Sequence, residues 1–353
     1  MNATRKIRLD RIASSTFNAR LEHDVVIGPE IVAREGYVLA VRLLNDKTTY
    51  HHLENCSGRL IRLHRGDVIA GTLGTRRALR GYAGTIPETI APGDTIHLLN
   101  LGGVLGRCTS ANPEIGPPFD AEVLGAVLSF PRVGDRIGAP AHVRSGAVSP
   151  AKTIHSHIPI VFVAGTSMNS GKTVAASEIV RGLRRAGRRV AGMKLTGVSL
   201  RRDALSMIDA GAIDARTFTD AGIVSTHDSD VLPAARGVIN FLGEKVKPDV
   251  IVAELGDGIL GEYGVATLLA NPEVMDLAEA LVVCAPDQVG AWGAVHLLEQ
   301  RFALRPTLIT GPVTDNEVGC SFIESHLDLP AINARRFPER LAARIEEVLR
   351  DDA

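Results

Sequence analysis

One short stretch of the sequence holds the residue types that bind phosphate groups. Residues 158–177 read IPIVFVAGTSMNSGKTVAAS, an apolar run that gives way to small and polar residues and then to Gly-Lys-Thr. A phosphate-binding loop needs inward-facing backbone N–H groups, the amino terminus of a helix behind them, a lysine, and a hydroxyl for magnesium. Gly171, Lys172 and Thr173 match these needs, so the stretch predicts phosphate chemistry.

The spacing of this loop departs by one residue from the usual pattern G-x-x-x-x-G-K-[ST]. Counting back from Gly171 places Thr166 where the first glycine belongs, with Gly165 one position earlier. The small residues that follow would let the backbone curl around a phosphate. The candidate binding residues are Gly165, Thr166, Asn169, Ser170, Gly171, Lys172 and Thr173. The alternative is a glycine-rich strand-to-helix turn with a solvated lysine.

Two charged residues stand near the ends of later apolar runs. They are Lys194, in the run 188–196, and Glu254, in the run 248–255. Ligands of open parallel sheets bind at the carboxyl ends of the strands, and Mg²⁺ takes one or two carboxylates together with phosphate oxygens and water. Glu254 is therefore a candidate magnesium ligand and Lys194 a candidate ligand contact. The alternative for both is a charge solvated at the end of a strand.

The second half of the chain has the alternating pattern of strands and helices that could position these residues. Continuous apolar runs, as expected for parallel strands covered on both faces, occur at 158–165, 188–196, 248–255, 279–286 and 305–312. Helical candidates follow at 172–187, 201–212, 231–245, 288–302 and 337–350. The pattern predicts a doubly wound, mostly parallel α/β sheet.

The first half reads as short strands separated by turns. Stretches rich in Val, Ile and Leu occur at 37–44, 59–74, 94–107 and 121–128. Turn signals such as Arg-Gly-Asp and Pro-Gly-Asp punctuate them, and no long 3.6-residue period appears. Pro, Gly and Ser gather at 109–120 and 130–157. We predict a smaller β-rich domain, a barrel or a sandwich, over 1–150 and the α/β domain over 151–353.

The composition of the chain argues against some classes of binding partner. The formal net charge is -1 and aromatic residues make up 4% of the chain, which argues against nucleic acid or an anionic membrane surface as a partner. The four cysteines lie far apart, which indicates reduced thiols rather than a zinc or disulfide framework. With no apolar run long enough to span a membrane and no secretory signal at the start, we expect a cytoplasmic protein.

The loop GTSMNSGKT resembles that of dethiobiotin synthetase and its relatives, the cobyrinic acid diamide synthases and the molybdopterin-guanine dinucleotide accessory proteins. Their loops also run from a Gly-Thr pair, with one extra residue, to Gly-Lys-Thr. The resemblance extends through VAAS…GLRRAGRRVAGMKLTG and covers residues 158–315. It implies a P-loop NTPase domain that uses Mg²⁺ and ATP, with GTP as an open alternative, and a homodimer.

The resemblance also implies roles for single residues. Lys172 would hold the β and γ phosphates, and Thr173 would bind magnesium. Asp203 and Glu254 would complete the metal shell, although Asp203 is also explained as a negative charge favoured at the start of a helix. Lys194 would neutralise charge on the moving phosphoryl group. Lys172 and Lys194 are thus the candidate catalytic residues.

Three functions follow as hypotheses. The leading one is an Mg-ATP-dependent ligase or kinase that phosphorylates a carboxylate or a similar small-molecule acceptor. Dethiobiotin synthetase itself does not fit, because it is a single domain and because Met168 and Asp257 depart from its pattern near the substrate. The alternatives are a nucleotide-hydrolysing switch or metallochaperone that acts on a protein partner, and a polynucleotide kinase, which the neutral charge and the lack of a stacking aromatic series weaken.

Two polar clusters can be interpreted either as functional sites or as solvated surface loops. The loop FTDAGIVSTHDSD at 218–230 could bind a metal or act as acid and base, or it could be a solvated acidic turn. The stretch GTRRALRGY at 74–82 could bind a phosphate or carboxylate, or it could be a solvated basic loop.

Overall fold

The structure is a computed structural model that describes residues 4–131 and 134–351. Residues 1–3, 352–353 and 132–133, the last pair inside the Pro-, Gly- and Ser-rich stretch 130–157, lie outside the described residues. The chain forms two compact units. The first comprises Met1–Val148, Val198–Arg202 and Thr219–Ser225, and the second comprises Ser149–Gly197, Asp203–Phe218 and Thr226–Ala353.

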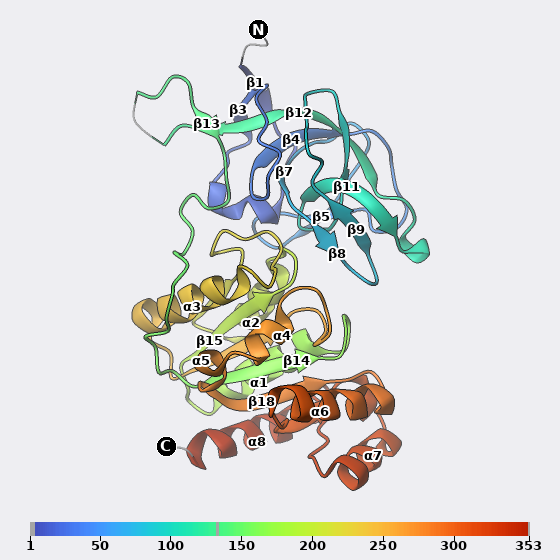
Figure 1. Cartoon of the computed structure of the whole chain (residues 1–353), viewed down its shortest axis with the longest axis vertical. Helices are drawn as coiled ribbons and strands as arrows, with labels where there is room; N and C mark the ends of the chain where they lie inside the picture. Colours follow the sequence, from blue (N-terminus) through green and yellow to red (C-terminus); the bar gives the residue numbers. More distant parts are fainter. Residues whose placement is uncertain (1–3, 132–133, 352–353) are drawn as a thin grey trace. The chain divides into compact units, whose positions relative to one another are not determined.

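The first unit is built on a mostly antiparallel sheet, to which eleven strands contribute among the described residues (Figure 1). They are β1 (Arg5–Arg8), β2 (Arg11–Ile12), β3 (Asp24–Gly28), β4 (Val38–Leu43), β7 (Val68–Leu73), β8 (Arg76–Arg77), β9 (Tyr82–Thr85), β10 (Thr95–Leu98), β11 (Val104–Ala111), β12 (Phe119–Ser129) and β13 (Ala139–Pro140). A separate hairpin joins β5 (His52–Glu54) to β6 (Leu60–Arg62). Short helical turns lie at η1 (Ser14–Ala19) and η2 (Pro113–Ile115).

Five of these strands close into a barrel. β12 pairs with β4, β4 with β7, β7 with β11, β11 with β10, and β10 with β12 again. Alternate residues of β4 enter two different clusters, Leu39, Val41 and Leu43 in one and Val38 and Ala40 in the other. Because side chains alternate across a strand, one face of the strand fills the barrel interior and the other packs outside it.

The second unit contains a six-stranded parallel sheet in the order β16-β15-β17-β14-β18-β19. The strands are β14 (Ile160–Gly165), β15 (Val190–Thr196), β16 (Asp214–Thr217), β17 (Val250–Leu255), β18 (Ala278–Cys284) and β19 (Leu308–Thr310). Every residue of β14, β15 and β17 is buried. This explains their continuous apolar character, because both faces of the sheet are covered.

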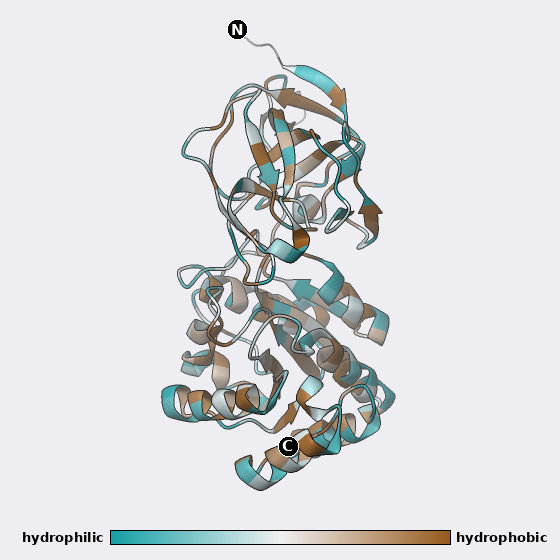
Figure 2. Cartoon of the chain, turned by 90° about the vertical axis from the view of Figure 1, so that its right-hand side faces the viewer, coloured by the Kyte–Doolittle hydropathy of each residue, from teal (hydrophilic) through white to brown (hydrophobic). Residues whose placement is uncertain are grey.

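Helices flank the parallel sheet. They are α1 (Lys172–Arg185), α2 (Arg202–Ala210), α3 (Val231–Phe241), α4 (Val265–Leu269), α5 (Pro272–Met275), α6 (Gln288–Phe302), α7 (Glu317–Leu327) and α8 (Pro338–Asp351), with short turns at η3 (Leu242–Val246) and η4 (Pro312–Thr314). Figure 1 shows α1 and α8 on one side of the sheet and α3 on the other. Hydrophilic and hydrophobic residues alternate along these helices (Figure 2), and the apolar stripe of α1, with Ile179 and Leu183, packs against Leu341 and Ile345 of α8.

The predicted fold class is confirmed as an α/β unit with a parallel sheet, preceded by a β-rich unit. The five strands and five helices predicted for the second half are present, with ends that differ by a few residues. The sequence pattern missed β16, whose residues Asp-Ala-Arg-Thr are only partly apolar because it is an edge strand. It also missed α7.

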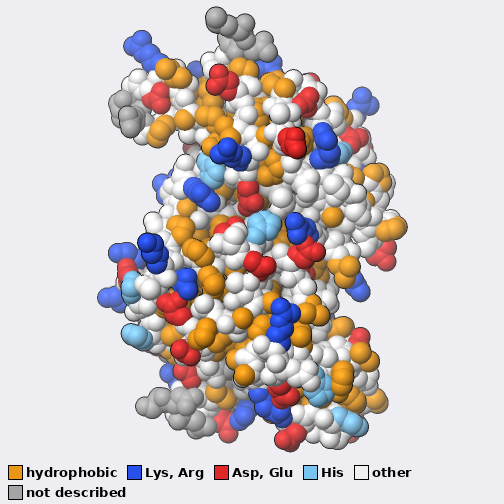
Figure 3. Space-filling model, in the orientation of Figure 1, with side chains coloured by type: hydrophobic (Ala, Val, Ile, Leu, Met, Phe, Trp, Pro, Cys, Tyr) orange, Lys and Arg blue, Asp and Glu red, His pale blue; other side chains and the backbone are white. Residues whose placement is uncertain are grey.

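Neither sign of charge gathers on the face drawn in Figure 3, where acidic and basic side chains are interspersed with apolar ones. This dispersion agrees with the formal net charge of -1. Within the described part of the chain, no helix is both long enough and apolar enough to cross a membrane.

Candidate functional site

The phosphate-type loop follows the strand at which the order of the parallel sheet reverses. β14 lies between β17 and β18, and β15, which comes next in the chain, lies beyond β17. The strands β15, β16 and β17, which follow β14 in the chain, therefore lie on one side of it in the sheet. The last two strands, β18 and β19, lie on its other side. Such a reversal opens a crevice at the carboxyl ends of the strands, where ligands of open α/β sheets bind.

The loop turns tightly between β14 and α1. Asn169 and Gly171 have positive φ values of 63° and 103°, a conformation that glycine adopts without strain. The Thr166 N–H donates to the Cys284 carbonyl at 3.0 Å and ties the loop to β18. A side chain at Gly165 would collide with the Ser170 hydroxyl. Gly165 therefore takes the role of the first glycine, which accounts for the extra residue in the spacing.

Two further glycines bring neighbouring backbone against the loop. A Cβ atom at Gly258, after β17, would collide with the Thr166 carbonyl. At Gly311, after β19, it would collide with the Ser170 carbonyl, and Gly311 has a φ of +95°. Sequence reasoning missed both residues. Their only signal was a glycine placed just after a buried strand.

Lys172, the first residue of α1, is buried although it carries an ammonium group. It is 6% exposed, and its Nζ donates to the Ser167 carbonyl at 2.8 Å and lies 3.5 Å from the Ser170 hydroxyl. Burial lowers the pKa of Lys172. Because its hydrogen-bond partners are neutral oxygens, an anion bound in the loop would offset the cost of burying this charge.

Glu254 of β17 faces the start of the same helix. The Thr173 hydroxyl donates to Glu254 Oε1 at 3.1 Å. Its other carboxylate oxygen, Oε2, is buried and has no hydrogen-bond partner among the described residues. Burial first, and then the negative charge of Asp203, raise the pKa of Glu254 to about 7. A carboxylate held in this way gains stability from a cation.

Lys194 and Asp203 form a buried ion pair. Lys194 lies near the carboxyl end of β15, opposite Glu254 in the register of β15 and β17, and Asp203 lies in the first turn of α2. The register therefore brings the two predicted strand-end charges together, and Asp203 joins them through its ion pair. Both partners are less than a tenth exposed. The pair is therefore shielded from water, and charges attract each other more strongly in the protein interior than in water.

Asp257 extends the charged group beyond the predicted residues. It has a φ of +73° between two glycines, which is strained for a residue with a side chain. Burial raises the pKa of its carboxyl group, and the charge of Lys172 opposes that rise. Loop 256–258 thus places a third carboxylate near the phosphate-type loop.

The other two clusters do not assemble. Arg76 is buried and donates to the Tyr50 hydroxyl at 2.9 Å and to the Leu99 carbonyl, whereas Arg77 and Arg80 are exposed. Within residues 4–131 and 134–351, no three His, Cys, Asp or Glu side chains gather to hold a metal ion. The acidic loop at 218–230 therefore supports no metal site.

The order of β14, the loop and α1, with the parallel sheet around it, is that of the P-loop NTPase fold. No protein-family model matches the chain, and no curated protein matches it.

Solved structures similar to this chain include a DUF1611 family protein from Anabaena variabilis ATCC 29413, with 14% identity over 64% of this chain and 70% of that one and a TM-score of 0.41. Another is the signal recognition particle 54 kDa protein from Aeropyrum pernix K1 in complex with GDP, with 17% identity over 58% of this chain and 50% of that one and a TM-score of 0.36. A third is the cell division protein FtsY from Thermotoga maritima, with 14% identity, coverages of 58% and 71%, and a TM-score of 0.37.

Proposed function

We propose that the second unit binds a nucleoside triphosphate with Mg²⁺ and transfers its γ-phosphoryl group to a carboxylate or a similar small-molecule acceptor. The observation that carries the proposal is the buried Lys172, whose ammonium group donates to the Ser167 carbonyl of a glycine-lined loop at the switch point of a parallel sheet and lies beside the Ser170 hydroxyl. Such a lysine is suited to polyphosphate, because a bound anion would offset the cost of burying the ammonium group.

The residues present fit a magnesium–nucleotide complex. Glu254 has a buried oxygen without a partner in the described part of the chain, and Thr173 lies within hydrogen-bond distance of its other oxygen. In this proposal Thr173, Glu254 and Asp203 hold the metal ion, and Lys172 holds the β and γ phosphates. The metal–nucleotide complex supplies the reactive phosphoryl group and screens its charge.

The chain's own contribution is positioning and electrostatics. Lys194 offers a positive charge at the carboxyl edge of the sheet, and Asp203 fixes that charge through the ion pair. Binding an acceptor carboxylate would draw Lys194 toward a second anion, which orients the acceptor beside the phosphate-type loop. The glycine contacts at Gly258 and Gly311 keep the loop from widening.

The proposal is tested by nucleotide turnover with γ-labelled ATP and GTP, run in parallel with and without small carboxylate acceptors. We expect turnover that requires Mg²⁺ and label that appears on an acceptor. In Lys172→Ala, turnover falls by about 10²-fold or more, in line with the loss of one charge-stabilising group. Lys245→Ala, which removes an exposed lysine, is the matched control and retains activity. Turnover that is unaffected by Lys172→Ala would overturn the proposal.

A second candidate is a nucleotide-driven switch that acts on a protein partner. It is favoured by the two segments that follow β15 and β16, because both belong to the first unit. There the Ser199 carbonyl accepts from Asn100 at 2.9 Å, and Glu35 accepts the N–H groups of Val224 and Ser225 at 3.0 Å each. Slow hydrolysis that is accelerated by a protein partner, with no label on any acceptor, would select the switch over the enzyme.

A further inference from the structure

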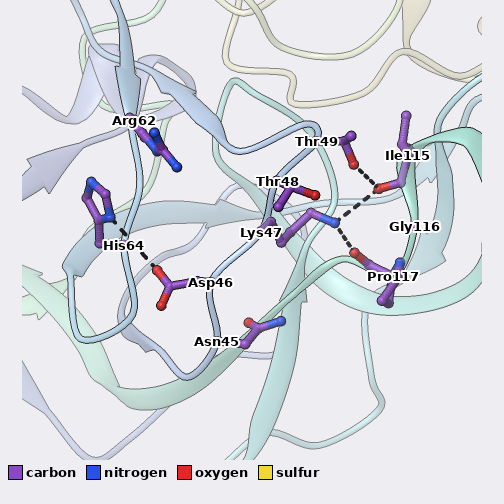
Figure 4. A pocket seen from close by; sticks show the side chains of 10 residues that line it. All are labelled: Asn45, Asp46, Lys47, Thr48, Thr49, Arg62, His64, Ile115, Gly116 and Pro117. Atoms are coloured by element: carbon purple, nitrogen blue, oxygen red, sulfur yellow. Dashed lines mark hydrogen bonds and ion pairs between the residues drawn. The ribbon is translucent and has the colours of Figure 1, made fainter.

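A cavity of about 540 Å³ lies in the first unit, apart from the phosphate-type loop. Its lining comes from three stretches, the loop 45–49, Arg62 with His64 on and after β6, and the turn 115–117. Figure 4 shows these side chains around one space, with the Arg62 guanidinium directed toward the loop that carries Lys47 and Thr48. The volume is in the range of small-molecule sites.

The wall of the cavity is held in place by its own hydrogen bonds. Lys47 Nζ donates to the Ile115 carbonyl at 3.1 Å and to the Pro117 carbonyl. The Thr49 hydroxyl donates to the same Ile115 carbonyl at 3.0 Å. Two residues of the loop 45–49 thus fix the turn 115–117, and the site is formed before any ligand arrives.

The lining carries more positive than negative charge. Lys47 and Arg62 line the cavity together with a single carboxylate, that of Asp46. Asp46 Oδ1 already accepts the N–H of Arg65 at 3.0 Å and lies 3.8 Å from His64 Nδ1. Asp46 is therefore engaged at one edge of the cavity, and the lining holds no second carboxylate to face Arg62.

Donors remain available within this lining. Neither the Arg62 guanidinium nor the Thr48 hydroxyl has a hydrogen-bond or ion-pair partner among the residues described. The same surroundings lower the pKa of the neighbouring His51. Burial is the largest cause, followed by the charges of His52, Arg62 and His64. A guanidinium fork and a hydroxyl on the lining of one cavity are donors of the kind that bind an oxyanion.

We propose that this cavity binds a small metabolite through a carboxylate or phosphate group, with Arg62 and Thr48 as its contacts and His64 at its edge. The shared chemistry is a small oxyanion. The site is independent of the function proposed for the second unit, because all its residues belong to the first.

The test uses the full chain in a Lys172→Ala background, so that phosphate binding at the loop 165–171 is weakened. Inorganic phosphate and succinate are titrated separately, and the imidazole ¹H–¹⁵N signals of His64, assigned by their loss in His64→Gln, report binding at the cavity. We expect a saturable shift of these signals. Arg62→Gln raises the Kd at least about tenfold, as expected for the loss of a charge-assisted hydrogen bond, and Thr48→Val raises it less.

Arg59→Gln, which removes an exposed arginine outside the cavity lining, is the matched control and leaves the Kd unchanged. A response to phosphate alone identifies a phosphate ligand, a response to succinate alone identifies a carboxylate, and a response to both supports the general oxyanion site. The proposal is wrong if neither probe shifts the His64 signals saturably, or if Arg59→Gln weakens binding as much as Arg62→Gln does.

Discussion

Each unit contains a glutamate that is almost completely buried, and the two carboxylates differ in how many hydrogen bonds they accept. Glu54, at the end of β5, is 0% exposed, and Glu254, in β17, is 3% exposed. The Glu54 carboxylate accepts the Ser14 hydroxyl and the backbone N–H groups of Arg201 and Arg202, the last two at 2.8 and 2.7 Å. Glu254 accepts one hydroxyl and has one oxygen without a partner among the described residues.

The difference separates a structural carboxylate from one suited to a ligand. Burying a carboxylate is costly unless donors replace the lost water. Glu54 has such donors, and through them it anchors the segment 198–202 within the first unit and satisfies N–H groups at the start of α2. Glu254 lacks them, and the surroundings raise its pKa to about 7. Perturbed, under-satisfied groups of this kind are concentrated at functional sites.

The largest expected effect is on catalysis, in Glu254→Gln. If Glu254 holds the metal ion, nucleotide turnover falls by about 10²–10³-fold, as for the loss of one group that stabilises transferred charge. The stability at neutral pH stays equal or rises, because a neutral amide replaces a carboxylate that is poorly satisfied. Steady-state turnover and denaturant unfolding of the same preparation measure the two quantities. A variant that is destabilised but fully active would reverse the comparison.

Glu54→Ala should have the opposite profile. It leaves the N–H groups of Arg201 and Arg202 and the Ser14 hydroxyl without their acceptor, at a cost of about 1–3 kcal/mol for such a loss and more where several donors are affected. We expect the unfolding free energy of the first unit to fall by about 3 kcal/mol on this basis. Urea unfolding measures it, and Glu244→Ala, at an exposed glutamate, is the control. An unchanged unfolding midpoint in Glu54→Ala would show that the three hydrogen bonds contribute little.

How much of this could be read from the sequence depends on how local each feature is. Five of the six described strands of the parallel sheet in the second unit and the loop 165–173 were predictable, because apolar runs and a Gly-Lys-Thr triplet are patterns within a few residues. The pairing of Lys194 with Asp203 was not, since it depends on how α2 returns to the sheet. The role of Glu54 was hidden for the same reason, because two of its donors are 147 and 148 residues away.

The pH dependence of stability sharpens the contrast further. The folded-state pKa of Glu254, about 7, lies above the ordinary value of 4.5 for a glutamate. The folded protein therefore holds this proton longer than the unfolded chain, so the stabilising contribution is fully present below pH 4.5 and is lost as pH rises through 7. By linkage the full loss is on the order of 3 kcal/mol.

Thermal unfolding in metal-free buffer from pH 5 to 8 measures this loss. The wild type should lose stability relative to Glu254→Gln as the pH rises, because the glutamine has no proton to release. A constant difference between the two proteins across this range would show that Glu254 titrates normally.

The smallest expected effect comes from the two hydroxyls that serve these glutamates. Ser14→Ala removes one of the three donors to the Glu54 carboxylate, and the unfolding free energy should fall by about 1 kcal/mol. Thr173→Val removes the hydrogen bond that Thr173 donates to Glu254 Oε1 at 3.1 Å. Glu254 can respond by keeping its proton, so the loss at pH 6 should be smaller than for Ser14→Ala. At pH 8 Glu254 can no longer keep its proton. The loss of unfolding free energy should therefore be larger at pH 8 than at pH 6 for Thr173→Val alone. If both variants respond equally to pH, the two buried carboxylates share one electrostatic environment and the distinction between them fails.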